Sequence, residues 1–383
     1  MFKQKESPDF FGAFFYAYIC LIMIHQPIYL DYAATTPVHP DVLSVMLPYF
    51  TEIYGNAGSS SHLYGWRAAD AVDQSRNMIA SYFQVKPAEV VFTSGATESI
   101  NLGIRGYLQV KPKGHVITSV LEHKAVLEVF HALENEGWEV TYIKDVSELA
   151  SVFRPGTVLV SLMLVNNELG SILPYQEVLK LCDEKGVCFH SDATQALGKL
   201  ELDMNQLPHL LSFSGHKIYG PKGIGGLITR KPIQAISYGG GQERGLRPGT
   251  LPVPLIVGLA KAIELIPLWL SRLPFYQVSM DQIKVLLPSD SINSPLNAVP
   301  GILNFTLKGA DWERMFQVLN GLAFSNGSAC NAKTELPSHV LKAIGHSDED
   351  ALASARFSLG YFTTPEEVDV ICEVLSQKLP QLL

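Results

Sequence analysis

The chain has 383 residues, of which 47% are hydrophobic and 17% charged, enough for a large core and about two domains. Its formal net charge of −8 argues against electrostatic binding of nucleic acid, so we expect no nucleic-acid partner. The 5 cysteines are scattered and form no CxxC pair, which argues against a disulfide framework and a zinc site. We therefore expect no metal and a reducing, cytoplasmic compartment.

The first 27 residues form an apolar extension. Its run Phe10–Ile24 follows two lysines and is short for a membrane span, which needs about 20 residues. No cleavage site of small residues follows, although the length suits a signal peptide. We expect that Met23 is the true start and that the residues before it are upstream sequence. A membrane anchor and a structured extension are the alternatives.

From about residue 89, short apolar runs alternate with longer segments of helical character. This order predicts a mainly parallel sheet between helices, with ligands bound at the carboxyl ends of the strands. Strands are expected at 90–92, 115–120, 138–143, 157–164, 187–190, 210–213 and 224–229, and helices at 100–108, 124–136 and 176–184.

The later part of the chain differs in character. A helix is predicted over 254–270, and the segment 274–300, rich in Pro, Ser and Asn, is predicted to be irregular. A second α/β unit follows from Ile302, with helices near 313–319 and 365–379. We interpret this part as a smaller C-terminal domain.

Lys217 is the most informative residue. It lies between an apolar run and a turn rich in Gly and Pro, within the segment 212–225. A lysine becomes a nucleophile toward carbonyl groups when a confined site lowers its pKa. Ser214 and His216, just before it, are suited to binding an anion such as a phosphate. This combination predicts a Schiff-base lysine for pyridoxal phosphate (PLP).

Two earlier segments carry groups for the same cofactor. Thr93–Ser99 follows a strand and opens a helix, so its N–H groups and the Thr97 hydroxyl form either a phosphate cradle or an ordinary helix cap. Asp192 follows a predicted strand, where its carboxylate either pairs with a protonated pyridine nitrogen or starts a turn. Gln195, three residues on, is placed to reach the phenolic oxygen of the same ring.

Four further polar segments have a functional and an ordinary interpretation each. His123 either stacks on the cofactor ring and shuttles protons or caps a helix. Asn166–Gly170 offers an amide to the ring hydroxyl or forms a turn. Arg356 either binds a substrate carboxylate or is a surface arginine. The glycine-rich segment 239–250 either approaches a phosphate or is a surface loop.

Cys330 differs from the other cysteines. Cys182, Cys188 and Cys372 lie among apolar residues, the setting of buried and inert thiols. Cys330 lies in a polar run of small residues, which predicts an exposed, mobile loop where a thiolate can form. A reactive role and an inert one remain open from these residues alone.

Together these segments resemble the cysteine desulfurases of the NifS/IscS type, in the class V aminotransferase group of fold-type I PLP enzymes. The resemblance covers nearly all of 28–371 and implies a large domain over 28–262 and a small one over 263–383, with 28–45 packing against the latter. It is carried by Tyr29-Leu-Asp-Tyr-Ala-Ala-Thr-Thr-Pro37, Gly55-Asn56, Ser94-Gly-Ala-Thr-Glu98, Glu122-His-Lys-Ala-Val126, Val165-Asn-Asn-Glu168, Asp192-Ala-Thr-Gln195, Ser214-Gly-His-Lys217, Arg247-Pro-Gly-Thr250, Gly327-Ser-Ala-Cys330 and Arg356-Phe-Ser-Leu-Gly360.

The resemblance implies a role for each matching residue. Lys217 binds PLP covalently, Asp192 pairs with the pyridine nitrogen and His123 stacks on the ring. Gln195 and Asn167 bind the ring oxygen. The phosphate is bound by Ala96, Thr97, Ser214 and His216, together with Thr250 of a second subunit. Arg356 and Asn167 bind the substrate carboxylate.

The implied reaction removes sulfur from L-cysteine. Lys217 and His123 transfer protons, the Cys330 thiolate attacks the substrate sulfur, and alanine leaves a persulfide on Cys330. We expect a homodimer that passes sulfur to an acceptor protein, either an iron–sulfur scaffold, whose cluster Cys330 would contact transiently, or a tRNA-thiolation enzyme. The alternatives are a selenocysteine lyase, another class V lyase or aminotransferase, or a non-enzymatic sulfur-trafficking protein.

Three features depart from the family pattern. The region 266–300 is shorter than usual. Gln242 and Tyr361 stand where histidine and arginine are common. The chain ends at Leu383, without the long tail with which IscS-type enzymes dock their scaffold.

Overall fold

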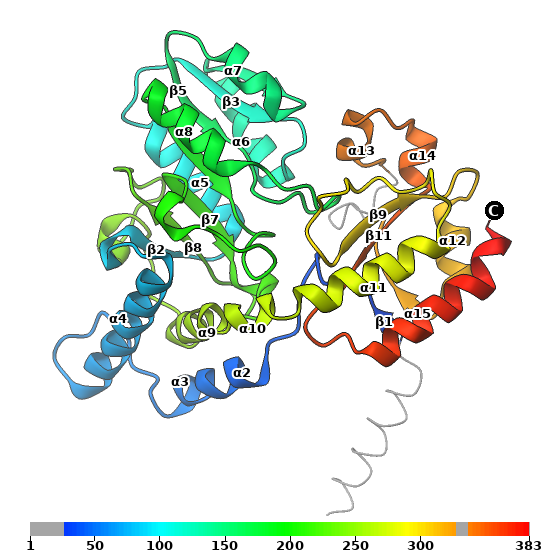
Figure 1. The fold of residues 1–383 in the computed structure, drawn as a ribbon. Helices are drawn as coiled ribbons and strands as arrows, with labels where there is room; N and C mark the ends of the chain where they lie inside the picture. Colours follow the sequence, from blue (N-terminus) through cyan, green and yellow to red (C-terminus); the bar gives the residue numbers. More distant parts are fainter. Residues whose placement is uncertain (1–26, 327–335, 383) are drawn as a thin grey trace, which may run out of the picture.

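The computed structural model describes residues 27–326 and 336–382. The chain forms two units joined side by side, a larger one around a central sheet and a smaller C-terminal one (Figure 1). The predicted apolar extension falls on residues 1–26 and therefore lies outside the described residues, as does Cys330.

The larger unit contains a seven-stranded sheet in the order β2-β8-β7-β6-β5-β3-β4. β8 pairs antiparallel with β2 and with β7, and the other strand pairs of this sheet are parallel, so the predicted mainly parallel α/β sheet is confirmed. The strands are β2 (Val90–Thr93), β3 (His115–Ser119), β4 (Glu139–Ile143), β5 (Thr157–Ser161), β6 (Cys188–Asp192), β7 (Leu210–Ser214) and β8 (Gly225–Thr229).

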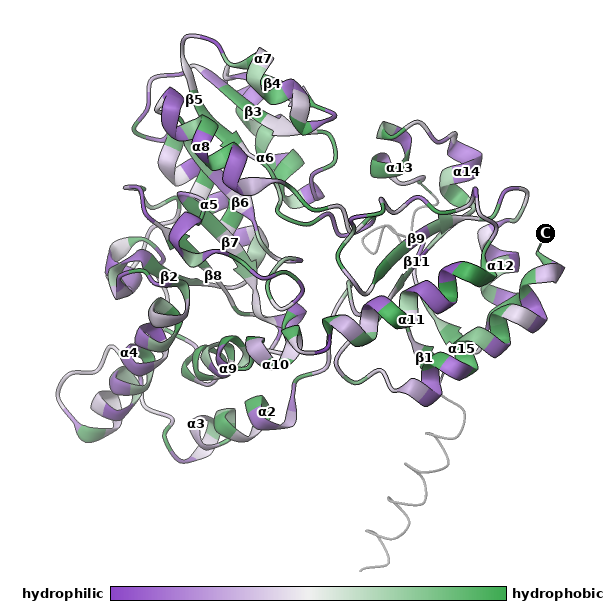
Figure 2. Cartoon of the chain, in the orientation of Figure 1, coloured by the Kyte–Doolittle hydropathy of each residue, from purple (hydrophilic) through white to green (hydrophobic). Residues whose placement is uncertain are grey.

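Both faces of this sheet are buried, because successive strand residues point to opposite faces. In β6, Cys188 packs into the core on one face, and Phe189 packs into the core on the other. The first face is covered by α5 (Ala96–Leu108) and α6 (Lys124–Asn135), and the second by α4 (Leu63–Phe83), α8 (Tyr175–Lys185) and α9 (Val253–Glu264). Figure 2 shows these helices with hydrophilic residues interspersed along them.

The smaller unit is built on β9 (Ile302–Thr306) and β11 (Ser354–Ser358), which pair antiparallel. Helices α11 (Leu273–Leu286) and α15 (Pro365–Lys378) pack against them around a second core. The N-terminal strand β1 (Ile28–Tyr29) pairs in parallel with β10 (Leu322–Ala323) of this unit. The domain boundary at 262/263 stays a prediction.

Two sequence-based predictions are wrong in this region. The segment 274–300 was expected to be irregular, but its first half is helix α11. Tyr276, Met280 and Ile283 recur there at helical spacing and fill the second core, and Pro274 lies in the first turn, where proline is tolerated. The helix predicted over 254–270 breaks at Leu265, before Pro267.

The remaining helices are short. They are α2 (Pro40–Met46), α3 (Pro48–Thr51), α7 (Leu149–Val152), α10 (Ile266–Leu270), α12 (Trp312–Val318), α13 (His339–Ala343) and α14 (Asp348–Leu352). Within the described ranges, no one helix has both the length and the apolar composition of a membrane span, and only a pair bent by 46°, 253–264 with 266–286, meets that test together.

Candidate active site

A cavity of about 650 Å³ opens at the carboxyl ends of the parallel strands. Asp192 ends β6 and Ser214 ends β7, so the strand order itself brings the polar residues together. The predicted site residues that line the cavity are Ala96, Thr97, His123, Asn167, Asp192, Gln195, Ser214, His216, Lys217 and Arg356. Thr250 is exposed and does not line it, and Cys330 lies outside the described residues.

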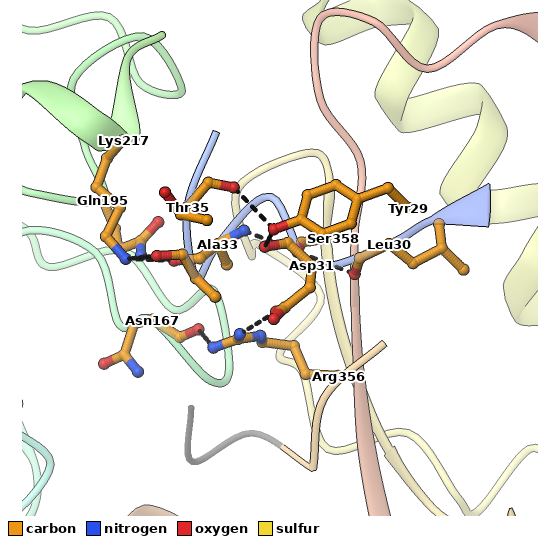
Figure 3. Close-up of polar contacts among 11 residues, drawn as sticks. Tyr29, Leu30, Asp31, Ala33, Thr35, Asn167, Gln195, Lys217, Arg356 and Ser358 are labelled. Carbon is orange, nitrogen blue, oxygen red and sulfur yellow. Dashed lines mark hydrogen bonds and ion pairs between the residues drawn. The ribbon is translucent and has the colours of Figure 1, made fainter. Parts of the chain in front are cut away.

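The Lys217 amine meets the N-terminal segment of the chain. Its Nζ donates hydrogen bonds to the carbonyl oxygens of Ala33 at 2.8 Å and of Ala34 at 2.5 Å. Ala33 also accepts from Nε2 of Gln195 at 2.7 Å (Figure 3). These alanines belong to the motif Tyr29–Pro37, but the sequence did not predict their contact with Lys217.

One end of the cavity is suited to an anion. The first turn of α5 presents Ala96 and Thr97, and Ser214 and His216 lie beside it. The turn can approach the sheet closely because Gly225 has no side chain, since a Cβ there would lie 2.7 Å from Cα of Gly95. These residues offer backbone N–H groups, hydroxyls and an imidazole to a bound phosphate.

His216 is a neutral imidazole at pH 7. Burial, followed by the charges of Lys217 and nearby lysines, lowers its pKa to about 4. Its Nδ1 lies 3.1 Å from the hydroxyl of Thr35, leaving Nε2 for a ligand.

The glycine-rich segment 239–250 is held beside this end by two ion pairs. Arg247 binds Glu98 at 2.9 Å, and Glu98 also lines the cavity. Buried Glu243 binds Arg76 at 2.5 Å and accepts the N–H of Phe92. The segment is therefore a surface loop that is fixed to α5 and β2.

Hydrogen-bond acceptors of Asp192, Thr194 and Gln195 lie in residues that line the cavity. One carboxylate oxygen of Asp192 accepts the N–H of Thr194 at 2.8 Å. Buried Oε1 of Gln195 and Oγ1 of Thr194 have no hydrogen-bond partner in the part of the chain that the structure describes. Buried polar atoms of this kind are rare and indicate a ligand or water at the site.

His123 caps a helix and also lines the cavity. Its Nδ1 accepts the N–H of Ala125 at 3.1 Å and so caps α6, while the ring lines the cavity. Because Nδ1 accepts, the proton of the neutral ring is on Nε2. Burial lowers the pKa of His123 from its ordinary value, which favours this neutral form.

Arg356 is buried, with only 1% of its surface exposed, so the surface interpretation is wrong for it. It binds Asp31 at 2.6 Å through Nη2 and the carbonyl oxygen of Asn167 at 2.8 Å through Nη1 (Figure 3). The neighbouring Asn166 forms the turn, because its side chain accepts the N–H groups of Glu168 and Leu169 at 2.9 Å each. That turn presents the Asn167 side chain to the cavity.

Sequence reasoning missed several titratable residues around the site. Glu122 is fully buried, and burial raises its pKa well above the ordinary carboxyl value. Burial also raises the pKa of Glu168. His339, from α13, lines the cavity, and Lys199 lies behind Lys217 with its Nζ buried. Their place around the site follows only from contacts between distant parts of the chain, because no local sequence pattern indicates it.

The other cysteines are structural in character. Cys182 and Cys188 are buried and Cys372 is half-buried. Burial raises the pKa of both Cys182 and Cys188 to about 12, so neither forms a thiolate at neutral pH. No group of three or more metal-binding side chains was found among residues 27–326 and 336–382.

Comparison with known proteins defines the class of this fold and site. The family model described as aminotransferase class-V matches residues 28–371, so the chain belongs to the class V aminotransferase family. Enzymes of this family depend on PLP.

Among its curated relatives, cysteine desulfurase IscS of Pectobacterium carotovorum subsp. carotovorum is 44% identical over 93% of both chains. The mitosomal cysteine desulfurase of Trachipleistophora hominis is 43% identical over 93% of this chain and 86% of its own length. A solved NifS-like protein superposes with a TM-score of 0.86 at 34% identity, covering 93% of this chain and 100% of its own. The solved structure of SspA in complex with cysteine superposes with a TM-score of 0.76 at 37% identity, covering 88% of this chain and 100% of its own.

Proposed function

We propose that this protein is a PLP-dependent cysteine desulfurase that converts L-cysteine to alanine and collects the sulfur on Cys330. Its relatives of 43–45% identity, matched over 93% of the chain, carry that name. The observation that supports the proposal most directly is the convergence of Lys217, Asp192, His123 and Arg356 on one cavity.

The residues present fit PLP. Ala96, Thr97, Ser214 and His216 would hold the phosphate, Asp192 the pyridine nitrogen, and Gln195 and Asn167 the ring oxygen. The partnerless Oε1 of Gln195 and Oγ1 of Thr194 are the kind of buried atoms that a bound group would satisfy. When bound, PLP supplies an electron sink that weakens bonds at the substrate's carbon atoms.

The chain's own residues bind and orient the substrate and move its protons. Arg356 would bind the carboxylate of cysteine through its guanidinium, which Asp31 and the Asn167 carbonyl hold in place. Lys217 and the neutral His123 would transfer protons, since both lie in the cavity. Cys330 would then accept the sulfur and carry it to an acceptor.

A homodimer is part of this proposal. Large apolar side chains are exposed along 43–66, which runs from α2 through α3 to the start of α4, and such patches mark interaction surfaces. They are Leu43, Leu47, Phe50, Tyr54, Leu63, Tyr64 and Trp66, which are 46–63% exposed. Thr250 does not line the cavity of its own chain, which supports a phosphate contact across the dimer.

The sulfur acceptor is proposed as an iron–sulfur scaffold or a tRNA-thiolation enzyme, and the compartment as the cytoplasm. Alternative class V reactions, including selenocysteine lyase, aminotransferase and C–S lyase chemistry, need no persulfide on Cys330. The sulfur-trafficking alternative without catalysis is disfavoured by the complete cofactor set.

The Cys330→Ala variant separates these functions. We expect it to retain visible PLP absorbance and to lose alanine release from L-cysteine, whereas a Cys372→Ala control keeps both. Undiminished alanine release by the Cys330→Ala variant would favour another class V lyase. A purified wild-type protein without PLP absorbance would instead favour the non-enzymatic alternative.

A further inference from the structure

A second lysine, Lys199, lies next to the candidate nucleophile. Lys199 and Lys217 line one small void of about 10 Å³, and Lys217 also lines the large cavity, which Lys199 does not reach. Gly198 makes this placement possible, because its φ of 73° suits glycine and a Cβ there would lie 3.1 Å from the Trp269 ring. The fold therefore brings a second amine up to Lys217 from behind.

The amine of Lys199 is buried without a partner. The residue is partly exposed along its stem, but its Nζ is buried and accepts or donates no hydrogen bond within 27–326 and 336–382. An ammonium group placed there loses its hydration and gains no hydrogen bond, so its charge is costly. Burial, followed by the charges of Lys217 and Arg356, lowers the pKa of Lys199 to about 7.

The other groups around the void do not neutralise this charge. Tyr219, which follows β7, and Tyr276, from α11, line the void, and burial raises the pKa of both phenols, so they stay uncharged at neutral pH. Arg356 adds positive charge from β11, although its ion pair with Asp31 at 2.6 Å offsets part of it. The two lysines therefore meet in surroundings that favour one positive charge over two.

The charge of Lys199 also acts on the large cavity. Burial is the main cause that lowers the pKa of His216, and the charges of Lys217, Lys222 and Lys199 lower it in that order. The other titratable groups that line the cavity with Lys217 and Arg356 are Glu98, His123, Lys124, Glu168, Asp192 and His339. Lys199 is thus within electrostatic range of the candidate phosphate site as well as of Lys217.

The hydrogen bonds of Lys217 favour its charged form. Its Nζ donates to the carbonyl oxygens of Ala33 and Ala34 at 2.8 and 2.5 Å, and a charged donor makes the stronger bonds. A lysine must be neutral to attack a carbonyl carbon, so an opposing effect is needed, and a neighbouring cation provides one. Coupling is reciprocal: because the charge of Lys217 weakens proton binding by Lys199, a charge on Lys199 weakens proton binding by Lys217 equally.

We propose that Lys199 is a positioning residue that acts on Lys217 through charge: at neutral pH the two amines together hold one proton in place of two. When that proton is on Lys199, Lys217 is neutral and nucleophilic. The inference rests on the proposed PLP-dependent function, in which Lys217 is the residue that captures the cofactor. It assigns to Lys199 no contact with cofactor or substrate.

The test compares Lys199→Met with the wild type, both as full-length protein freed of cofactor. Methionine keeps the apolar stem and removes the charge, and replacing a buried charge by an apolar side chain is often tolerated. Lys199→Gln repeats the comparison with a polar, uncharged side chain, and circular dichroism checks that each variant is folded. Lys180→Met is the matched control, because it makes the same change at an exposed position of α8.

Two readouts separate the role of Lys199 from the activity of the enzyme. The first is the pH profile of Lys217 acetylation by trace acetic anhydride, measured by mass spectrometry of the peptide that contains it. The second is the rate of PLP uptake at pH 7.5, followed by visible absorbance. A residue with a merely structural role would not move the pH profile.

We expect the labelling midpoint of Lys217 to lie below the ordinary lysine value of about 10.4 in the wild type. It should rise by about one pH unit in Lys199→Met and Lys199→Gln, with PLP uptake roughly tenfold slower. Lys180→Met should match the wild type in both readouts. The same midpoint in the wild type and both Lys199 variants, or an equal rise in Lys180→Met, would overturn the proposal. A wild type that takes up no PLP would refute the proposed function, and the labelling profile would still decide the role of Lys199.

Discussion

Lys217 and Ala33 are joined by a 2.8 Å hydrogen bond from Nζ to a backbone carbonyl oxygen, across 184 positions of the sequence. The N-terminal segment thus passes from its strand in the smaller unit to the amine in the larger one. This segment positions the candidate nucleophile and closes one wall of the cavity.

Ser358 should contribute to the stability of this wall. Its hydroxyl accepts the N–H of Ala33 at 2.8 Å and donates to the Leu30 carbonyl at 3.2 Å, both in buried surroundings. Ser358→Ala leaves a buried N–H without a partner, so we expect unfolding free energy to fall by about 1–3 kcal/mol, measured by denaturant titration. In the control variant Ser376→Ala, at an exposed helix position, the unfolding free energy should fall by much less. Equal losses in both variants would contradict this role.

Arg356 should act mainly on substrate binding. Arg356→Lys keeps the charge but loses the planar fork, so we expect KM for L-cysteine to rise roughly 10- to 100-fold, as loss of about 1.5–3 kcal/mol implies. Steady-state kinetics measures this change. Arg314→Lys is the control, since Arg314 is exposed and does not line the cavity. A variant with unchanged KM and reduced kcat alone would show that Arg356 does not bind the carboxylate.

His123 should act on the chemical step. His123→Gln removes a proton-transferring group from the cavity, and we expect alanine formation in a single turnover to slow by about 10²- to 10⁴-fold. His131→Gln serves as the control, because His131 lies on the same helix with 52% of its side chain exposed. Similar rates for the two variants would exclude proton transfer by His123.

Lys199 should make stability depend on pH. Burial, followed by the charges of Lys217 and Arg356, lowers its pKa to about 7, and its Nζ has no hydrogen-bond partner in the described ranges. The unfolded chain then binds more protons than the folded one between about pH 7 and the ordinary lysine value of about 10.4. Stability from this group therefore rises with pH across that window.

Lys199→Met should remove this pH-dependent contribution. We expect its unfolding free energy to change less between pH 7 and pH 9.5 than that of the wild type, as measured by denaturant titration at each pH. Lys180→Met, at an exposed position of α8, should keep the wild-type slope. An unchanged slope in the Lys199 variant would show that its ammonium is solvated in the folded protein.

The sheet and much of the site were predictable because local patterns encode them. Apolar runs become the seven strands, and the polar residues that follow them, such as Asp192 and His123, meet at one sheet edge. Helix α11 was not predicted, because Pro274 and the serines are typical of a loop, although Tyr276, Met280 and Ile283 recur at helical spacing.

Long-range contacts could not be predicted from local pattern. The carbonyl of Ala33 carries no side-chain signal, and its contact with Lys217 depends on how the two units dock. The same holds for His339, whose ring meets Glu122 across 217 positions. His339 looks like any histidine at the start of a short helix until the fold places it at the cavity.

Mass spectrometry of the cofactor-loaded protein after exposure to L-cysteine tests the central claim most directly. The account predicts that the peptide containing Cys330 gains the mass of one sulfur atom, with alanine released in equal amount, and that the peptides with Cys182 and Cys188 stay unchanged. Alanine release with no sulfur on Cys330, or sulfur on the other cysteines in its place, would contradict it.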